Sequence, residues 1–334
     1  MRVFIHYAPK HARDSFEGTR LRKTIKGACE LVDIEWVDFS SVSCDVAHFI
    51  SPLDYPLLRQ KKNEGTPCVV SCGYAESEKR ASFFEENILG DIYLNRRSRK
   101  ILQATDLILV PSNNIKEILE SSGITTKIEV VEPAVRLDRF DEATTEKEIF
   151  LRYFRIHNGT KTVVATGSYS DKTSVNLMKK LANLCPNIEF YFFGSSSTID
   201  PLNLIKMARN FHRGPNLHFC SLVQDDIYRS AMTSSIAYVE CPSAKPDSMV
   251  LLEAFAARCQ VVGLQPKKPN PLLVDGLTAK LFDNAEDMGS YLLDLAAGKA
   301  KDTLEEAYMQ AKGRSLYNLG KDLKDVYQRL TDVK

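Results

Sequence analysis

The chain lacks the motifs by which the commonest nucleotide-binding and metal-dependent enzymes are recognised. Its 334 residues contain no G-x-G-x-x-G fingerprint, no P-loop and no D-x-D pair. Because the first two are missing, neither hydride transfer with a dinucleotide nor P-loop phosphotransfer is indicated. Because the third is missing, a diphosphate held through a metal by paired carboxylates is disfavoured. We therefore expect no metal and no bound cofactor.

Long apolar runs and a strong charge of either sign are also missing. The formal net charge is +1, so no global field draws the chain to nucleic acid. The opening "MRVFIHYAPKHARD" is too short an apolar run for a secretory signal. No window approaches the ~20 apolar residues that a membrane span needs. We expect a cytoplasmic protein without a nucleic-acid partner.

The eight cysteines do not form the pattern of a disulfide framework. Most lie in apolar runs such as "PCVVSC" and "HFCSLV", which predicts small buried core residues in a reducing compartment. Cys68 and Cys72 suggest metal ligands at first sight. No second pair follows them at zinc spacing, so a core role is favoured.

What the chain does contain is an alternation of short apolar runs and helical patterns, repeated in two halves. Residues 1–141 and 146–315 each show the order that is typical of a parallel sheet. The charge-dense stretch 139–148 lies between them, and the amphipathic helix 316–334 is expected to return to the first domain. The predicted fold is α/β, with two Rossmann-like doubly wound domains facing an interdomain cleft. The cleft is expected because open parallel sheets bind ligands beyond the carboxyl ends of their strands.

The stretch "KPDSMVLLEAFAARCQVVG", residues 245–263, has the features of a ligand site. A helix is predicted from Ser248, and the backbone N–H groups at a helix start suit a diphosphate. Glu253 follows inside that helix, between "VLL" and "AFAA". A solvated helix glutamate is one interpretation. A ligand such as a ribose diol is favoured, because an ionised group on so apolar a helix costs several kcal/mol unless it is satisfied.

Seven segments share their order and spacing with one enzyme family. They are "DVAHFISP" (45–52), "ATDLILVPSNNIKEILESSGITTKIEVVEPAVRLDRF" (104–140), "VVATGSYSDK" (163–172), "NLHFCSLVQDDIYRSAMTSSIAYVECPS" (216–243), "VLLEAFA" (250–256), "LLVDGLTAKLF" (272–282) and "LYNLGKDLKDVYQRL" (316–330). Together they resemble the retaining glycosyltransferases of family 4, which have the GT-B fold. The resemblance runs along nearly the whole chain and implies a nucleotide-sugar donor in the second domain.

The family binds its donor with two glutamates eight positions apart. Glu253 matches the second, which the resemblance assigns to the ribose. Lys245 stands in place of the first, and Asp247-Ser248 stand in place of the usual Phe-Gly. A lysine cannot accept hydrogen bonds from sugar hydroxyls. It can pair with a uronic acid carboxylate or a phosphate while Asp247 reads the hydroxyls; alternatively, Lys245 is an exposed loop residue and donor binding is lost.

The diphosphate-binding pair of the family also differs here. Ser168 stands where the family has an arginine after the glycine, Gly167, and Lys172 follows one position early. We expect Lys172 and two helix N-termini, one of them at Ser248, Met249 and Val250, to neutralise the leaving group without metal. A solvated Lys172 is the alternative.

For the acceptor, the resemblance points to strand and helix ends of the first domain. The family's histidine after the fourth strand corresponds to Gly73, and Tyr74 beside it is a substitute. His48 is a candidate at a strand end, although a lone histidine in "DVAHFI" also fits a satisfied core residue. A helix start at Gly18-Thr19 is predicted to hold an acceptor phosphate.

Residues 82–100 mix aromatic and basic side chains. Arg96, Arg97, Arg99 and Lys100 close this segment, which suits peripheral contact with an anionic membrane and a lipid-linked acceptor. A long helix with a charged solvent face is the alternative. Localisation is accordingly expected in the cytoplasm, with or without membrane association.

The resemblance predicts a hexosyl- or glycuronosyltransferase. It would move a sugar from a nucleotide-diphosphate donor, UDP-linked, to a glycan or lipid-linked acceptor, with Lys172, Glu253 and Lys245 as the catalytic set. Transfer would be metal-independent and retaining. The altered Lys245, Ser168 and Gly73 motivate a rival, a non-catalytic partner subunit or glycan-binding module of the same fold. A nucleotide-sugar epimerase is a third hypothesis, and the sequence offers few of the carboxylates and histidines that it needs.

Overall fold

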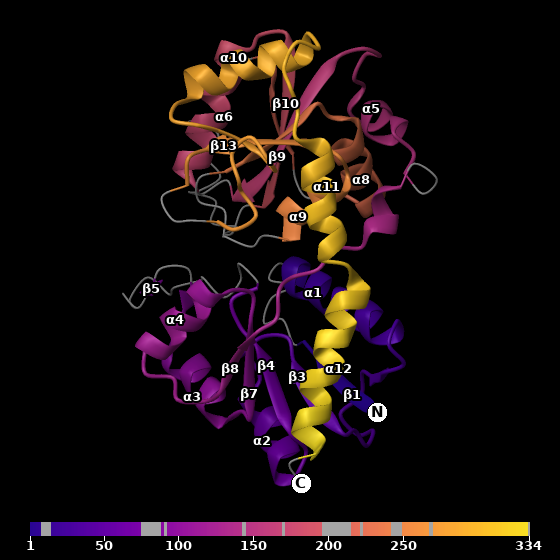
Figure 1. Ribbon diagram of the computed structural model, residues 1–334, viewed down its shortest axis with the longest axis vertical. Helices are drawn as coiled ribbons and strands as arrows, with labels where there is room; N and C mark the ends of the chain where they lie inside the picture. The colour runs from indigo at the N-terminus through magenta and orange to yellow at the C-terminus, as the bar shows by residue number, and fades with distance from the viewer. Residues whose placement is uncertain are drawn as a thin grey trace, which may run out of the picture. The chain divides into compact units, whose positions relative to one another are not determined.

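The structure, a computed structural model, describes residues 1–7, 15–74, 88–89, 92–141, 145–168, 171–195, 215–220, 223–241, 249–266 and 270–332. It divides into two compact units (Figure 1). Unit 1 comprises Met1–Ala134 and Arg314–Lys334, and unit 2 comprises Val135–Gly313. The C-terminal helix therefore belongs to the same unit as the N-terminal sheet.

Unit 1 is built on a six-stranded parallel sheet with the order β2-β1-β3-β4-β7-β8. Its strands are β1 (Arg2–His6), β2 (Glu35–Val37), β3 (Val46–Phe49), β4 (Cys68–Ser71), β7 (Leu107–Val110) and β8 (Ile128–Val130). The strands are short and rich in Val, Ile, Leu and Phe, and β3, β4 and β7 are buried throughout. Such runs are typical of a parallel sheet that helices cover on both faces.

The helices of unit 1 lie on the two faces of this sheet. One face packs against α2 (Tyr55–Asn63), α3 (Arg96–Ala104) and α4 (Asn113–Ser121), whose buried side chains share a core with alternate strand residues. The other face carries α1 (Ser15–Glu30) and α12 (Leu316–Asp332), which pack against each other. A short antiparallel pair, β5 (Ile88–Leu89) and β6 (Ile92–Tyr93), stands apart from the sheet.

The α1–α12 contact is unusually close at Gly320. A Cβ atom on Gly320 would lie 2.4 Å from the carbonyl oxygen of Ala28. Only a glycine lets the two helix backbones approach this closely. The C-terminal helix thus completes the second face of the N-terminal sheet, and Figure 1 shows it in yellow.

Unit 2 repeats the architecture with the strand order β11-β10-β9-β12-β13-β14, again all parallel. Its strands are β9 (Lys161–Ser168), β10 (Ile188–Ser195), β11 (Leu217–Cys220), β12 (Ala237–Glu240), β13 (Gln260–Leu264) and β14 (Lys280–Phe282). The chain enters at β9, runs outward to β11 and then returns to the other side of β9 with β12. The switch point of this sheet is therefore between β9 and β12, where doubly wound sheets bind their ligands.

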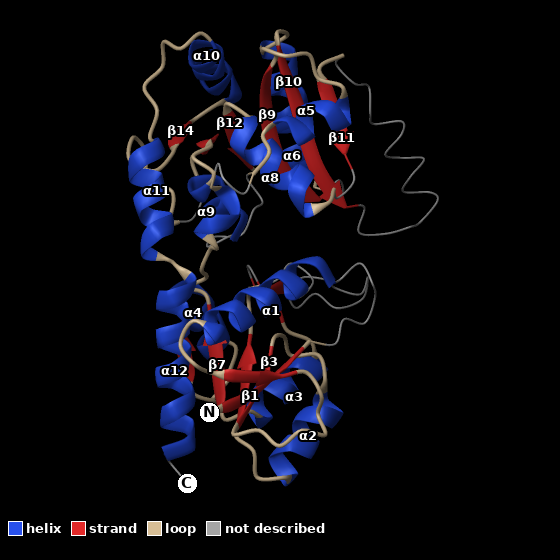
Figure 2. Ribbon diagram, turned by 90° about the vertical axis from the view of Figure 1, so that its right-hand side faces the viewer, coloured by secondary structure: helices blue, strands red, loops and turns tan. Residues whose placement is uncertain are grey.

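Helices cover both faces of the second sheet as well, as Figure 2 shows. One face packs against α6 (Lys172–Leu184) and α10 (Ala285–Ala296). The opposite face packs against α5 (Glu148–Phe154), α8 (Asp225–Ser234), α9 (Met249–Ala256) and α11 (Leu304–Gly313). The short 3₁₀ segment η2 (Leu137–Phe140) lies on this face, in contact with α8 and α9.

The cysteines behave as the sequence predicts. Seven are buried, Cys44 is half-buried, and all eight are free thiols.

In the described ranges, no three or more His, Cys, Asp or Glu side chains cluster as a metal site would require. Within those ranges there is also no helix with the length and apolarity to span a membrane.

Candidate functional site

The carboxyl edge of the unit 2 sheet brings several of the predicted donor-site residues to one switch point. Strand β9 ends there with Gly167 and Ser168, and the neighbouring β12 ends with Glu240. Helix α6 begins after β9 at Lys172, and α9 begins after β12 at Met249. Lys245, Asp247 and Ser248 lie outside the described residues, so their predicted roles stay predictions.

Lys172 is the first residue of α6 and is exposed. The helix therefore starts at the lysine itself. Asp171 caps the helix: its carboxylate accepts from the N–H groups of Thr173 and Ser174, at 3.0 and 3.3 Å. Since these two donors are already satisfied, the expectation that two helix N-termini share the diphosphate is not supported for α6.

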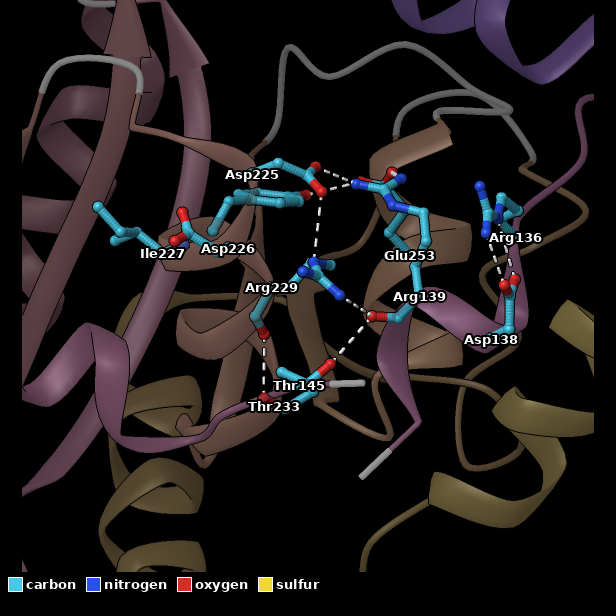
Figure 3. Close-up of polar contacts among 11 residues, drawn as sticks. Arg136, Asp138, Arg139, Thr145, Asp225, Asp226, Ile227, Arg229, Thr233 and Glu253 are labelled. Atoms are coloured by element: carbon cyan, nitrogen blue, oxygen red, sulfur yellow. Dashed lines mark hydrogen bonds and ion pairs between the residues drawn. The ribbon is translucent and has the colours of Figure 1, made fainter. Parts of the chain in front are cut away.

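Glu253 is buried. Its exposed fraction is 3%, which rules out the solvated helix glutamate. The carboxylate accepts a hydrogen bond on Oε1 from Nη1 of Arg139 at 3.0 Å (Figure 3). It accepts another on Oε2 from the Tyr228 hydroxyl at 2.8 Å. Among the described residues, one cation and one neutral donor thus compensate its charge, as a buried carboxylate requires.

The residues around Glu253 extend the network to the start of α8. Arg139 also pairs with Asp225 through Nη2, and Arg229 lies 3.3 Å from the same carboxylate. The backbone carbonyl of Arg139 in turn accepts from Arg229 Nη1 at 3.0 Å and from Thr145 Oγ1 at 2.9 Å (Figure 3). Arg139 is therefore held at both its backbone and its guanidinium.

Arg139, Tyr228 and Asp225 are not among the site residues that the sequence predicts, and neither are Arg229 and Thr145. Arg139 is the second-last residue of the resemblance segment 104–140, and Tyr228 and Asp225 lie in the segment 216–243. That position within matched segments is the one local signal they carry. The pairing itself joins residues 114 positions apart, which no local pattern reveals.

Glu240 is a second buried carboxyl group at this edge. It is 6% exposed, and among the described residues its Oε2 has no hydrogen-bond partner. Burial raises the pKa of Glu240 to about 8, and a hydrogen bond from Tyr238 offsets only part of that shift. Because the described residues offer it no ion pair, we take Glu240 as a neutral carboxylic acid at pH 7.

In unit 1 the first helix, α1, does not begin at Gly18-Thr19 as predicted. Helix α1 begins at Ser15, so Gly18 and Thr19 lie inside it and not at its N-terminus. The Tyr7 ring occupies the space beside Gly18, where a Cβ would meet Tyr7 Cζ at 2.1 Å. A close contact between α1 and Tyr7, the residue after β1, accounts for this glycine, and the predicted acceptor phosphate at Gly18-Thr19 finds no support.

His48 is a core histidine. Its side chain is fully buried, with Nδ1 at 2.7 Å from the Tyr327 hydroxyl and Nε2 at 2.8 Å from Ser71 Oγ. Burial lowers the pKa of His48 to about 3, so the ring is neutral at pH 7. Since both nitrogens are engaged and no ring atom faces solvent, the geometry favours the core alternative over contact with an acceptor.

Gly73 and Tyr74 follow β4. Gly73 has φ +86°, and a Cβ there would meet Ile115 Cγ2 at 2.8 Å, so no histidine side chain fits in this conformation. The Tyr74 hydroxyl donates to the carbonyl of Val131. Tyr74, His48 and Ser71 line a cavity of about 10 Å³, which holds at most one water and no sugar.

The chain is similar to glycosyltransferases along nearly its whole length, although no protein-family model matches it. A processive diacylglycerol alpha-glucosyltransferase of Acholeplasma laidlawii is 20% identical over 314 residues, covering 92% of each sequence. Among solved structures, Anabaena Alr3699/HepE, in complex with UDP and glucose, is 10% identical and has a TM-score of 0.73. The similarity covers 98% of this chain and 99% of that one.

A second solved structure, a glycosyltransferase from Rickettsia africae ESF-5, is 13% identical with a TM-score of 0.68, and it covers 98% of each chain. The two six-stranded parallel sheets with their flanking helices are thus those of the GT-B glycosyltransferases, and the predicted fold class is confirmed. Membership of family 4 and a retaining mechanism stay predictions.

Proposed function

We propose that this protein is a glycosyltransferase that moves a sugar from a UDP-linked donor to a glycan or lipid-linked acceptor. The observation that carries the proposal is Glu253, a buried and charge-compensated carboxylate on α9, the helix that follows β12 of the switch point. A carboxylate at this place accepts hydrogen bonds from a ribose diol. The glycosyltransferase names of the similar proteins, one of them solved with UDP and glucose, support the same activity.

In this proposal the donor is held at three points. Glu253 accepts from the ribose hydroxyls, while Lys172 and the start of α9 at Met249 and Val250 neutralise the diphosphate without metal. The bond between the anomeric carbon and the β-phosphate oxygen breaks, and the acceptor oxygen forms the new glycosidic bond. The acceptor proton passes to the leaving diphosphate. The configuration is retained, and no protein nucleophile takes part.

A lipid-linked acceptor is supported by the diacylglycerol named in the similar Acholeplasma enzyme and by the basic surface of α3. Arg96, Arg97 and Lys100 are exposed on this helix, whereas Arg99 donates to the carbonyl of Ser122. Exposed cations on one helix attract anionic headgroups. We place the enzyme in the cytoplasm, at the membrane surface while it works on such an acceptor.

A donor screen tests the proposal. Release of free nucleotide would be measured with UDP, GDP and CMP sugars, including uronic acids, with and without EDTA. We expect one UDP-sugar to be turned over regardless of EDTA, and Glu253→Ala to abolish that turnover. If the enzyme prefers a uronic acid donor and this preference disappears in Lys245→Ala, the lysine binds the carboxylate of the donor sugar. Turnover that EDTA stops would overturn metal independence.

A non-catalytic partner or glycan-binding module is the second candidate. Gly73 has no room for the family's histidine, and Asp171 already satisfies two N–H groups of α6. Both features weaken a catalytic interpretation. Thermal stabilisation by UDP-sugars without turnover, even with acceptors from a cell extract, would favour this candidate over the enzyme.

A further inference from the structure

Arg139 lies at the centre of the polar network in Figure 3. Its guanidinium reaches Glu253 through one terminal nitrogen and Asp225 through the other. The side chain keeps 22% of its surface exposed, whereas that of Glu253 keeps 4%. Arg139 therefore connects a buried carboxylate with the rim of the unit.

The position of Arg139 is itself constrained. Its backbone carbonyl accepts hydrogen bonds from Arg229 on α8 and from Thr145, at 3.0 and 2.9 Å. The short η2 segment that carries it packs against α8 and α9. A planar guanidinium held at both ends offers its N–H groups in a fixed direction, which an ammonium on a flexible stem does not.

Two hydrogen bonds from described residues fix the plane of the Glu253 carboxylate. Arg139 donates to one oxygen and Tyr228 to the other, so rotation about the last side-chain bond breaks both contacts at once. A carboxylate has about four acceptor positions, so one donor on each oxygen does not by itself exhaust either of them. An orientation fixed in this way suits a vicinal diol, because its two hydroxyls then meet two oxygens in one plane.

We propose that Arg139 is the positioning residue that makes the donor site selective for ribonucleotides over 2′-deoxyribonucleotides, by fixing the Glu253 carboxylate. This inference rests on the proposed function, since it takes Glu253 as the residue that binds the ribose. It adds that selectivity for the 2′-hydroxyl depends on a residue that does not itself contact the nucleotide.

Titration calorimetry with UDP and 2′-deoxy-UDP tests the inference. For the wild-type protein we expect UDP to bind more tightly by about 10- to 100-fold, the value of one hydrogen bond to a charged acceptor. In Arg139→Met this ratio should fall to within about threefold of unity, because the carboxylate loses its fixed plane. Arg136→Met is the matched control: Arg136 lies in the same segment and pairs with Asp138, and its variant should keep the ratio.

Two further variants guard against a misfolded Arg139→Met protein. Arg139→Lys keeps the positive charge but loses the planar guanidinium. Tyr228→Phe removes only the hydroxyl that donates to Oε2 of Glu253. Each should lower the ratio in a protein with unchanged circular dichroism. In the Glu253→Ala background, Arg139→Met should change the ratio no further, because the two residues act as one unit.

The outcomes separate the inference from the proposed function. If Arg139→Met weakens both nucleotides equally and leaves the ratio unchanged, Arg139 is only structural and the inference is wrong. The inference would also be wrong if Arg139→Lys and Tyr228→Phe both kept the wild-type ratio of affinities for UDP and 2′-deoxy-UDP. If Glu253→Ala itself keeps the wild-type ratio, or the wild-type protein binds no UDP, then the ribose assignment to Glu253 fails, and with it that part of the proposed function.

Discussion

The two units share one architecture but place their buried polar side chains in different settings. In unit 1, Ser71, His48 and Tyr327 form a chain in the core, fully enclosed between the sheet and α12. In unit 2, Glu253 is equally buried, but its network reaches Asp225, whose side chain is 64% exposed at the start of α8. One polar group is sealed, whereas the other is connected to the surface.

The difference shows what each polar group stabilises. Buried polar atoms must find hydrogen-bond partners, and a closed chain satisfies them within the fold. The chain in unit 1 therefore fixes α12 to the N-terminal sheet. The network in unit 2 satisfies Glu253 in the same way, yet it ends at the edge where parallel sheets bind ligands. Similar chemistry thus serves structure in unit 1 and, by our proposal, recognition in unit 2.

The largest effect is expected from Glu253→Ala, which breaks the network in unit 2. The release of UDP from the preferred donor should fall by about 100-fold or more, because a charge-assisted contact to the ribose is lost. Ser71→Ala, its counterpart in unit 1, should leave the rate per folded molecule unchanged. Equal losses of rate in the two variants would remove the distinction between the units.

Gly320→Ala tests the packing of α12 against α1 in unit 1. The new Cβ would lie 2.4 Å from the Ala28 carbonyl oxygen, so α1 and α12 must separate. We expect the free energy of unfolding in denaturant to fall by about 2–3 kcal/mol. Gly313→Ala is the matched control, because a Cβ there meets nothing within 4 Å. If both variants are equally stable, the close approach of the two helices is not required.

Tyr327→Phe removes one hydroxyl from the enclosed chain. It leaves His48 Nδ1 without its partner in a fully buried site, which should lower the free energy of unfolding by about 1–2 kcal/mol. The affinity for UDP should not change. Tyr317→Phe on the same helix alters a side chain that is 53% exposed, and it should unfold like the wild-type protein. A Tyr327→Phe protein of undiminished stability would contradict a structural role for the chain.

The last prediction concerns pH, and the sign of the effect differs between the units. In the unfolded chain Glu240 loses its proton near the ordinary pKa of 4.5, whereas in the folded protein it keeps that proton up to about pH 8. The contribution of Glu240 to stability therefore falls as pH rises between these two values. For His48, the unfolded chain takes up a proton near pH 6.5 that the folded protein refuses down to about pH 3. This contribution therefore falls as pH decreases.

Glu240→Gln isolates the first of these two contributions. The variant should raise the midpoint of thermal unfolding at pH 8 and have little effect at pH 5. Glu286→Gln serves as control, because an ion pair with Lys180 lowers the pKa of Glu286 and keeps its titration below this window. An identical pH profile for wild type and Glu240→Gln would mean that Glu240 is not a neutral acid in the folded protein.

Most of the fold could be predicted because its signals are local. The apolar runs "DVAHFI", "LILVPS" and "IAYVEC" contain β3, β7 and β12, since a strand buried on both faces has the same composition wherever it occurs. Helix α5, which follows a charge-dense stretch, was not predicted. The start of α1 was also misplaced, because Gly18 marks a close contact with Tyr7 and not a helix end.

For the candidate site, prediction stopped at single residues. The apolar neighbours of Glu253 indicated burial, and the structure places it in the core. Its partners Arg139 and Tyr228 could not be anticipated, because they come from η2 and α8, which only the folded sheet brings beside α9. His48 had a fitting position in the family pattern, yet α12 closes over it from the far end of the chain.

The sequence by itself determined that this chain forms two parallel, helix-covered sheets, because hydrophobic periodicity acts over a few neighbouring residues and is written continuously along the chain. Tertiary structure alone decided which polar groups are sealed and which reach an edge. A hydrogen bond forms only when donor and acceptor come within about 3 Å of each other. Such proximity between Tyr327 and His48, or between Arg139 and Glu253, exists only once the distant segments have packed.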